Sequence, residues 1–248
     1  YRSSTLIVGT HSIRLSVLAP LVRSPKFKEV VRFPQTQRFI YDLAVAEPIH
    51  TFVTVERSEP HKNIVRAINA YGELLKRRPD LTESTRFLLM LTPGPTHISA
   101  YKRVSEEIRR AARKVNDLAK NSNPVRVYEE NNFYRAIAAL SIYDTLVSVP
   151  VADGVGRSPL GGPIVNTKNG GMILSENDAT KGLFGDSVST VGITDIAGIS
   201  FAMEAAADES LESRFTKSEA ILDILRSIDP TSAARQFLSE LNEVDHTQ

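Results

Sequence analysis

Hydrophobic positions in this chain follow two alternating patterns. Short runs rich in β-branched and aromatic residues, the first two at 5–8 and 50–55, are typical of strands. Between such runs lie segments whose apolar residues recur every three or four positions, for example Ile64, Ile68 and Tyr71, as on the buried face of a helix. Strands that alternate with helices of ten or more residues predict a parallel sheet covered by helices on both faces.

The same patterns continue to the C-terminus. Further strands are predicted at 86–91, 125–128, 145–149, 172–175 and 188–191. Helices are predicted at 64–78, 97–118, 133–140, 178–183, 194–207, 210–226 and 230–242. The predicted fold class is therefore α/β, a Rossmann-like parallel sheet with helices on both faces, forming one domain over 1–248.

Composition removes several classes of function. The 248 residues include no Cys, which excludes disulfide scaffolds, thiolate metal sites and thiol nucleophiles. Five scattered His include no pair at helical ligand spacing, so we expect neither a metal site nor a cofactor. No apolar run approaches the roughly 20 residues that cross a bilayer, and the start lacks a signal-peptide pattern. We expect a cytoplasmic protein with no membrane partner. The first residue is Tyr, which is compatible with a start inside a longer polypeptide.

Charge is unevenly distributed along the chain. Residues 1–126 carry 22 basic and 11 acidic side chains, whereas 127–248 carry 8 and 18, an asymmetry that can mark a nucleic-acid surface. Much of the positive charge belongs to one predicted helix, with Lys102, Arg103, Arg109, Arg110, Arg113 and Lys114. Acidic residues interrupt this set and no nucleic-acid motif accompanies it. We therefore interpret it as a solvated helix face and expect no nucleic-acid partner.

The loop after the strand 50–55 is the first candidate site, because ligands of open parallel sheets bind at the carboxyl ends of strands. Arg57 and Lys62 lie in it, just before a predicted helix. Both are placed to turn toward a phosphate at that helix N-terminus, where free N–H groups favour an anion. The alternative is that they form surface ion pairs with Glu56 and Glu59. Spacing alone leaves both possibilities open.

The second candidate is the glycine-rich loop predicted at 153–162. Four of the 13 glycines fall within nine residues directly after a strand, so backbone amides there can approach a phosphate or sugar closely. The alternative is an ordinary turn between strand and helix, because no P-loop ending follows. Asp153 and Glu176 would form an acid/base pair only if the fold brought them together. Otherwise Asp153 anchors its loop through hydrogen bonds.

These loops and their neighbours resemble the trehalose-phosphate synthase family. Residues 55–66 are similar to that family's V-D-R-x-[DE]-x-x-K-[GN] segment, and 128–132 resemble Y-x-E-N-N. Residues 150–161 resemble the P-x-x-D-G-M-N-L-x-x-x-E loop, and 173–176 match V-L-S-E. The resemblance extends to the actinobacterial branch that includes validoxylamine-phosphate-synthase-type pseudo-glycosyltransferases.

The resemblance implies a GT-B fold, of which this chain would be the C-terminal, nucleotide-sugar-binding half. The N-terminal acceptor domain would be absent from the chain, and 230–242 would be a crossover helix that packs on it. The implied activity is retaining transfer, by a glycosyltransferase or pseudo-glycosyltransferase, from a UDP or GDP sugar or cyclitol to a phosphorylated sugar-like acceptor. The implied protein partner is an N-terminal-domain polypeptide or a second copy of this chain.

The resemblance also implies the residues of the site. Arg57 and Lys62 would be catalytic, stabilising charge on the departing diphosphate, and no protein nucleophile would be required. The residues implied to bind the nucleotide sugar are Arg57, Lys62, Tyr128, Asp153, Gly154, Val155, Gly156, Arg157 and Ser158.

The chain departs from the family motif at several positions. Gly161 replaces the Glu that holds the nucleotide ribose, and Gly156 replaces the Asn. Ala152 and Pro95 stand where the family often has Arg. These departures leave two alternatives to an active transferase. One is a non-catalytic nucleotide-binding or regulatory homologue that partners an active subunit. The other is a generic anion-binding α/β module whose likeness is only architectural.

Overall fold

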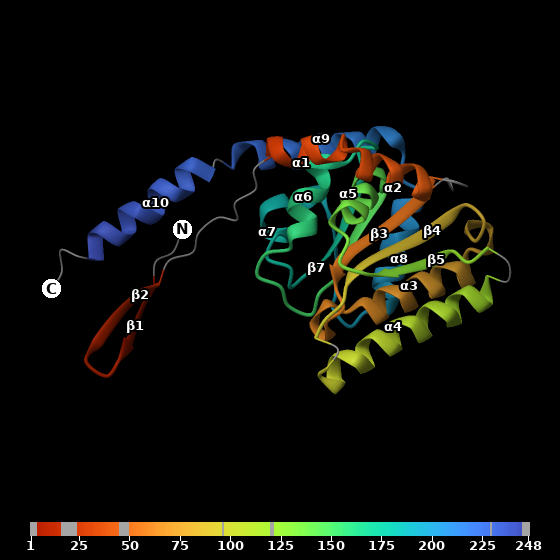
Figure 1. The fold of residues 1–248 in the computed structure, drawn as a ribbon, viewed down its shortest axis with the longest axis horizontal. Helices are drawn as coiled ribbons and strands as arrows, with labels where there is room; N and C mark the ends of the chain where they lie inside the picture. The colour runs from red at the N-terminus through yellow and green to blue at the C-terminus, as the bar shows by residue number, and fades with distance from the viewer. Residues whose placement is uncertain are drawn as a thin grey trace.

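Six parallel strands form the main sheet of the protein (Figure 1). A computed structural model describes residues 4–15, 24–44, 50–95, 97–119, 122–228 and 230–244. The strands of the sheet are β3 (His50–Arg57), β4 (Thr85–Thr92), β5 (Val125–Glu129), β6 (Thr145–Ser148), β7 (Gly171–Ser175) and β8 (Ser189–Val191). Their spatial order is β5-β4-β3-β6-β7-β8. The chain therefore builds outward from β3 in one direction and from β6 in the other, which creates a topological switch point between these two strands.

Helices cover both faces of this sheet, as predicted. One face is packed against α3 (Ile64–Arg77), α4 (Ser99–Leu118) and α8 (Ile196–Ala207). The other is packed against α1 (Ser24–Val31), α2 (Pro34–Ala44), α5 (Phe133–Ile142), α6 (Arg157–Val165) and α9 (Leu211–Ser227). Short helical turns occur at α7 (Lys181–Phe184), η1 (Pro60–Lys62), η2 (Pro79–Leu81) and η3 (Gly185–Ser187).

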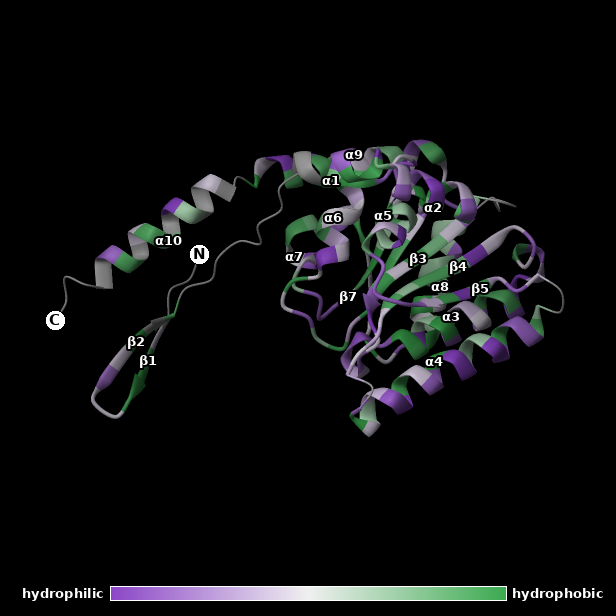
Figure 2. Cartoon of the chain, viewed as in Figure 1, coloured by the Kyte–Doolittle hydropathy of each residue, from purple (hydrophilic) through white to green (hydrophobic). Residues whose placement is uncertain are grey.

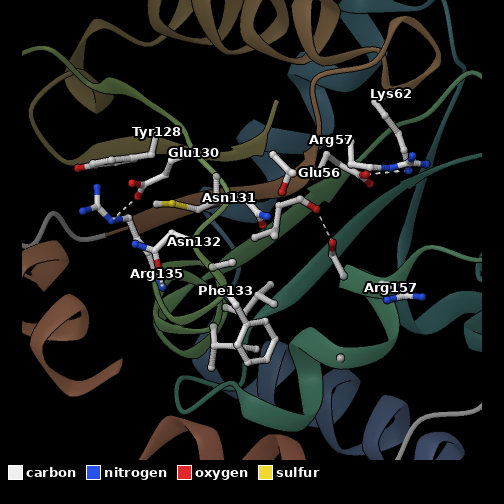
Figure 3. A pocket seen from close by; sticks show the side chains of 18 of the residues that line it. Glu56, Arg57, Lys62, Tyr128, Glu130, Asn131, Asn132, Phe133, Arg135 and Arg157 are labelled. Carbon is white, nitrogen blue, oxygen red and sulfur yellow. Dashed lines mark hydrogen bonds and ion pairs between the residues drawn. The ribbon is translucent and has the colours of Figure 1, made fainter. Parts of the chain in front are cut away.

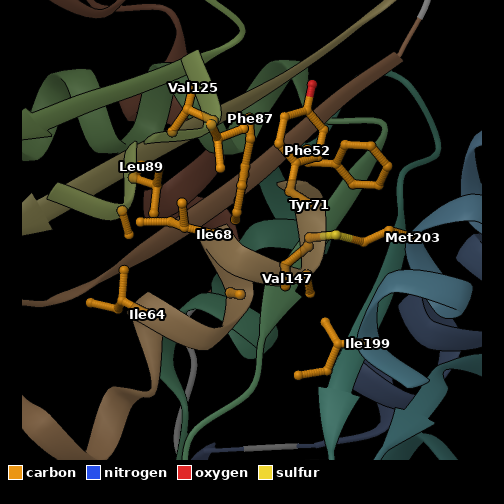
Figure 4. Packing of buried hydrophobic residues seen from close by; sticks show 14 of the residues in the cluster. Phe52, Ile64, Ile68, Tyr71, Phe87, Leu89, Val125, Val147, Ile199 and Met203 are labelled. Carbon is orange, nitrogen blue, oxygen red and sulfur yellow. The ribbon is translucent and has the colours of Figure 1, made fainter. Parts of the chain in front are cut away.

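Alternating side chains of each strand supply the two cores. On β4, Phe87 and Leu89 contribute to the cluster under α3 (Figure 4), whereas Leu88 and Met90 contribute to the cluster on the opposite face. Because both faces are covered, every residue of β4 except the last is buried, which explains the unbroken apolar run 87–91 at its centre. Figure 2 shows this apolar interior between helices whose outer faces are polar.

Pairing between the central strands is uneven. β3 and β4 share eight register pairs, from His50↔Thr85 to Arg57↔Thr92. β3 and β6 share two, Phe52↔Thr145 and Val53↔Leu146. The two halves of the sheet therefore meet along a short seam at the switch point.

The N-terminal segment differs from expectation. The predicted strand 5–8 is β1 (Ser4–Val8), but it pairs antiparallel with β2 (His11–Leu15) in a separate hairpin rather than joining the main sheet (Figure 1). Neither β2 nor the helices α1 and α2 were predicted from the sequence. Gly9, with φ of +63°, makes the tight turn between the strands. The hairpin's apolar side chains are exposed, including Ile7 at 73%.

The C-terminal helix α10 (Pro230–Val244) also lies outside the packed layers (Figure 1). Three apolar side chains on it form an uncovered stripe, Phe237, Leu238 and Leu241, exposed by 44%, 58% and 49%. Among the described residues nothing covers this stripe.

The glycine-rich loop is shorter than predicted. The loop ends at 156, and α6 begins at Arg157, so the prediction of a loop over 153–162 was wrong in its second half. Every residue from Ser158 to Val165 is buried. A Cβ added to Gly162 would lie 3.3 Å from side-chain carbons of both Leu140 and Leu146. This glycine permits close packing of α6 rather than approach of a ligand to the backbone.

Buried charged and polar groups gather at the amino ends of β3 and β6. The Asp144 carboxylate accepts hydrogen bonds from the backbone N–H of Thr51 at 2.9 Å and from Arg214 Nη1 at 3.0 Å. His50 Nε2 lies 2.9 Å from Thr145 Oγ1. Burial lowers the pKa of His50 to about 4, because desolvation disfavours the imidazolium. The ring is therefore neutral in the folded chain at neutral pH.

We expect His50→Gln to reduce the loss of unfolding free energy that occurs as the pH falls. In the wild type, the unfolded chain gains a proton on His50 below about pH 6.5 whereas the folded chain gains it near pH 4, so stability is lost as the pH falls between these values. The loss approaches about 3 kcal/mol. Urea unfolding between pH 7 and 4.5 measures it. The exposed His97→Gln is the control, and equal profiles for wild type and His50→Gln would contradict the expectation.

Candidate functional site

A pocket opens at the carboxyl ends of the strands, beside the switch point. Its volume is about 590 Å³. The walls come from the ends of β3, β4 and β5, the loop after β6, and helices α5 and α6 (Figure 3). Both candidate loops of the sequence analysis contribute to it. This is the position at which open α/β sheets bind ligands.

Direct bonds hold the two candidate loops side by side. The backbone N–H of Val151 donates to the carbonyl of His61 at 2.7 Å. Asn63, between η1 and α3, has a left-handed φ of +60°, a conformation that Asn tolerates better than most residues. Its amide donates to the carbonyls of Val149 and Ile193 at 2.9 and 2.8 Å. These bonds fix Lys62 beneath the loop that follows β6.

Lys62 is the buried cation of the site. Its Nζ lies 2.7 Å from Glu56 Oε2 and 2.6 Å from Asp153 Oδ2, and the side chain is 7% exposed. Burial alone would lower the Lys62 pKa, but the two carboxylates outweigh it and raise the pKa. Burial raises the pKa of Glu56. The pair with Glu56 is the ion-pair alternative considered from the sequence, here buried rather than at the surface. Asp153 anchors the loop after β6 through the second pair.

Arg57 makes a different contact. Its Nη1 lies 2.7 Å from Glu59 Oε1, and its side chain is 62% exposed. The ion-pair alternative considered for this residue is thus the one present in the structure. Arg57 nevertheless lines the pocket with Lys62. Because exposed pairs of this kind are weak, its guanidinium is free to turn to another anion at little cost.

The segment after β6 lines the pocket with some of its predicted residues. Asp153, Val155, Arg157 and Ser158 are in the wall, and Gly161 also reaches it from α6. Ser158 Oγ donates to the carbonyl of Val55, which ties the start of α6 to β3.

The two predicted glycines of this loop are not in the wall. Gly154 is exposed, and a Cβ there would meet nothing within 4 Å. A Cβ on Gly156 would lie 2.9 Å from the ring of Pro159. These glycines shape the turn into α6.

The end of β5 supplies the opposite side of the pocket. Tyr128 was predicted there, but Glu130, Asn131, Phe133 and Arg135 were missed. Arg135 Nε pairs with Glu130 Oε1 at 2.9 Å, and its guanidinium lies 4.8 Å from the centroid of the Tyr128 ring. Phe133 is 54% exposed. Aromatic faces and the Asn131 amide together suit a flat ring with polar edges. The Y-x-E-N-N likeness was the available signal for this side.

An apolar floor completes the pocket. Met90, Ile137 and Leu140 line it together with Phe27 of α1, which the sequence analysis missed because it did not predict α1. The Phe27 ring lies 3.5 Å from the position that a Cβ on Gly161 would occupy. An aromatic ring therefore faces the site where the resembling motif carries Glu.

The acid/base pair considered from the sequence has a structural outcome. Asp153 binds Lys62, while Glu176 accepts a hydrogen bond from the N–H of Ile193 at 3.5 Å, so the acid/base pair considered from sequence is not formed. Over the described ranges no three His, Asp or Glu side chains are grouped to hold a metal ion. No described helix is both long and apolar enough to cross a membrane.

Strand order and pocket position define a Rossmann-type α/β domain with a pocket at its switch point. The chain belongs to glycosyltransferase family 20, whose family model matches residues 5–243. This match excludes a likeness that is only architectural.

Proteins of similar sequence and similar fold support this membership. Validamine 7-phosphate valienyltransferases from two Streptomyces hygroscopicus subspecies, jinggangensis and limoneus, are each 27% identical over 150 residues, covering 60% of this chain and 30% of the relative. The α,α-trehalose-phosphate synthase (UDP-forming) of Burkholderia xenovorans, in complex with glucose-6-phosphate, superimposes with a TM-score of 0.88 at 16% identity. That match covers 97% of this chain and 54% of the synthase.

A further similar structure is an E. coli trehalose-6-phosphate structure bound with UDP-2-fluoro glucose. It superimposes with a TM-score of 0.85 at 16% identity, covering 96% of this chain and 56% of its own. The present chain thus spans about half the length of these structures.

Proposed function

We propose that this chain is the donor-binding half of a cytoplasmic retaining glycosyltransferase or pseudo-glycosyltransferase. It would take a sugar or cyclitol from a UDP or GDP carrier and pass it to a phosphorylated sugar-like acceptor. Family membership supports the reaction class. The names of the relatives support the substrate classes, since they include UDP-forming synthesis, glucose-6-phosphate and validamine 7-phosphate.

The observation that carries this proposal is the division of the pocket into two chemically different sides. Arg57 and Lys62 lie on one side, and Tyr128 and Asn131 lie on the other (Figure 3). A nucleoside diphosphate has the same division, with an anionic diphosphate at one end and a flat base at the other. Ligand sites typically combine a mostly apolar lining with a few such directed polar groups.

The proposed chemistry requires charge stabilisation more than a nucleophile. When the bond between the sugar and the diphosphate breaks, negative charge grows on the leaving phosphate oxygen. Cations already positioned beside that oxygen stabilise the transition state more than the ground state. Lys62 is cationic at neutral pH because its pKa is raised. To reach the phosphate, it would exchange a carboxylate partner, Glu56 or Asp153, for the leaving group.

The acceptor would be held by a polypeptide equivalent to the other half of the relatives, or by a second copy of this chain. We propose that the uncovered stripe on α10 meets this second component, because three large apolar side chains there, Phe237, Leu238 and Leu241, have no cover within the described chain. Covering such a stripe is favourable in proportion to the apolar area removed from water.

We expect the chain alone to bind UDP or GDP at micromolar or weaker affinity and to release no nucleoside diphosphate from UDP-glucose or GDP-glucose. The reason is that the cations are present while the ribose carboxylate and the acceptor side are absent. Calorimetry measures the first result, and chromatography of the nucleotides the second. Adding the N-terminal half of a relative together with glucose 6-phosphate should then yield a disaccharide phosphate. Submicromolar affinity, or steady release by the chain alone, would contradict the proposal.

A further inference from the structure

Arg157 differs from the other cations of the pocket because no described carboxylate pairs with it. It lines the cavity from the first turn of α6 and is exposed. Within the described residues it makes no ion pair or hydrogen bond through its side chain. Its positive charge is therefore uncompensated by any described side chain, and the residue borders a pocket large enough for a ligand.

The remaining cations of the pocket are each neutralised by carboxylates. Lys62 pairs with Glu56 and Asp153 at 2.7 and 2.6 Å. Arg57 pairs with Glu59, and Arg135 pairs with Glu130. An anion that approaches any of these three must compete with a carboxylate already in place. An anion that approaches Arg157 does not.

Figure 3 places Arg157 on the same side of the pocket as Arg57 and Lys62 and away from Tyr128 and Arg135. Three cations from two separate segments, 57–62 and the first turn of α6, therefore border one end of the cavity. The resembling D-G-M-N-L motif has Leu where this chain has Arg157. The positive charge is thus a departure from the motif, just as the loss of the motif's Glu at Gly161 is.

We propose that Arg157 binds the diphosphate of the donor directly and is the main source of its affinity in this chain. The inference rests on the proposed function. A guanidinium can hold two phosphate oxygens at once, and here it does so without first breaking an ion pair. The phosphate then draws Arg57 away from its exposed contact with Glu59. Lys62 joins last, because its two carboxylates hold it most firmly.

The test compares Arg157→Ala, Arg157→Lys and Arg113→Ala in the 248-residue chain. Arg113 is an exposed arginine on α4, outside the pocket, and serves as the matched control. Calorimetry with UDP, GDP and inorganic pyrophosphate gives the dissociation constants, and thermal unfolding checks that each variant is folded. We expect Arg157→Ala to weaken binding of all three probes about tenfold or more, as for loss of a charge-assisted hydrogen bond. Arg157→Lys should lose less, and Arg113→Ala should change nothing.

The salt dependence provides an independent readout. Because Arg157 is exposed, its contribution is screened by added salt, so wild-type affinity should fall more steeply between 50 and 300 mM NaCl, about a sixfold range, than that of Arg157→Ala. If the dissociation constants of Arg157→Ala lie within about twofold of those of the wild type, this inference is overturned while the proposed function stands. Arg157-dependent binding of pyrophosphate without binding of UDP or GDP would support it and contradict the proposed nucleotide. Absence of binding by all three probes would overturn both.

Discussion

Lys62→Met should lower the free energy of unfolding at pH 7 by about 3 to 5 kcal/mol, the usual cost of removing one partner of a buried ion pair. Met keeps the length and apolar stem of Lys but not its charge. The carboxylates of Glu56 and Asp153, 9% and 16% exposed, would then face each other without a cation. Urea unfolding of the folded variant measures the loss.

Two controls separate this effect from simple loss of packing. Lys76→Met removes a surface pair with Glu73, in which both side chains are 47% exposed, and should cost little. The double variant Lys62→Met with Glu56→Gln should recover part of the loss, because one uncompensated charge is gone. Lowering the pH should also narrow the deficit. The Glu56 pKa is already raised by burial, so its carboxyl regains a proton as the pH falls through that raised value. A deficit that is independent of pH would contradict this account.

Asp144→Ala should destabilise the chain by a similar amount, about 3 to 5 kcal/mol. Asp144 is 3% exposed and accepts from the Thr51 N–H and from Arg214. Its removal leaves the buried Arg214 guanidinium, 8% exposed, without its counterion and leaves a central-strand amide without an acceptor.

Thermal unfolding of Asp144→Ala beside Asp144→Ala with Arg214→Met tests the cause. If the buried charge is responsible, the double variant should be more stable than the single one. Asp80→Ala, which removes an exposed partner of Arg78, is the control and should unfold close to the wild type. A double variant less stable than Asp144→Ala would show that packing dominates at this position.

The main sheet was predictable because buried parallel strands are written as uninterrupted apolar runs. The unbroken apolar run 87–91 lies within β4 (Thr85–Thr92), whereas the segment 125–128 within β5 (Val125–Glu129) was predicted from its β-branched and aromatic residues, with Arg126 among them. The helix α6 was not predictable in this way. It contains Gly161, Gly162 and Pro163, all poor helix formers, and every residue after Arg157 is buried. Its apolar residues do not recur every three or four positions as on an amphipathic helix, so tertiary packing decides its conformation.

Part of the site was predictable for a different reason. A loop after a parallel strand must end at the ligand edge of the sheet, which placed Arg57, Lys62 and Asp153 together before any geometry was known. Phe27 and Arg135 could not be found in this way. Phe27 lines the pocket through the packing of α1, and Arg135 is held by Glu130 and stacked rings. Such neighbours are set by three-dimensional contacts that no local pattern records.

The short seam between β3 and β6 gives ligand binding a second effect. Two register pairs join the half-sheets there, directly below the pocket. Arg57 belongs to one half, while Asp153 and Arg157 belong to the other. A molecule held by both sets would act as a non-covalent crosslink across the strand pair that has the fewest register pairs in the main sheet. By mass action, a ligand at 100 times its dissociation constant adds about 2.7 kcal/mol to the stability of the bound fold. For a ligand bound as proposed, occupancy of the pocket and cohesion of the sheet would therefore be thermodynamically linked.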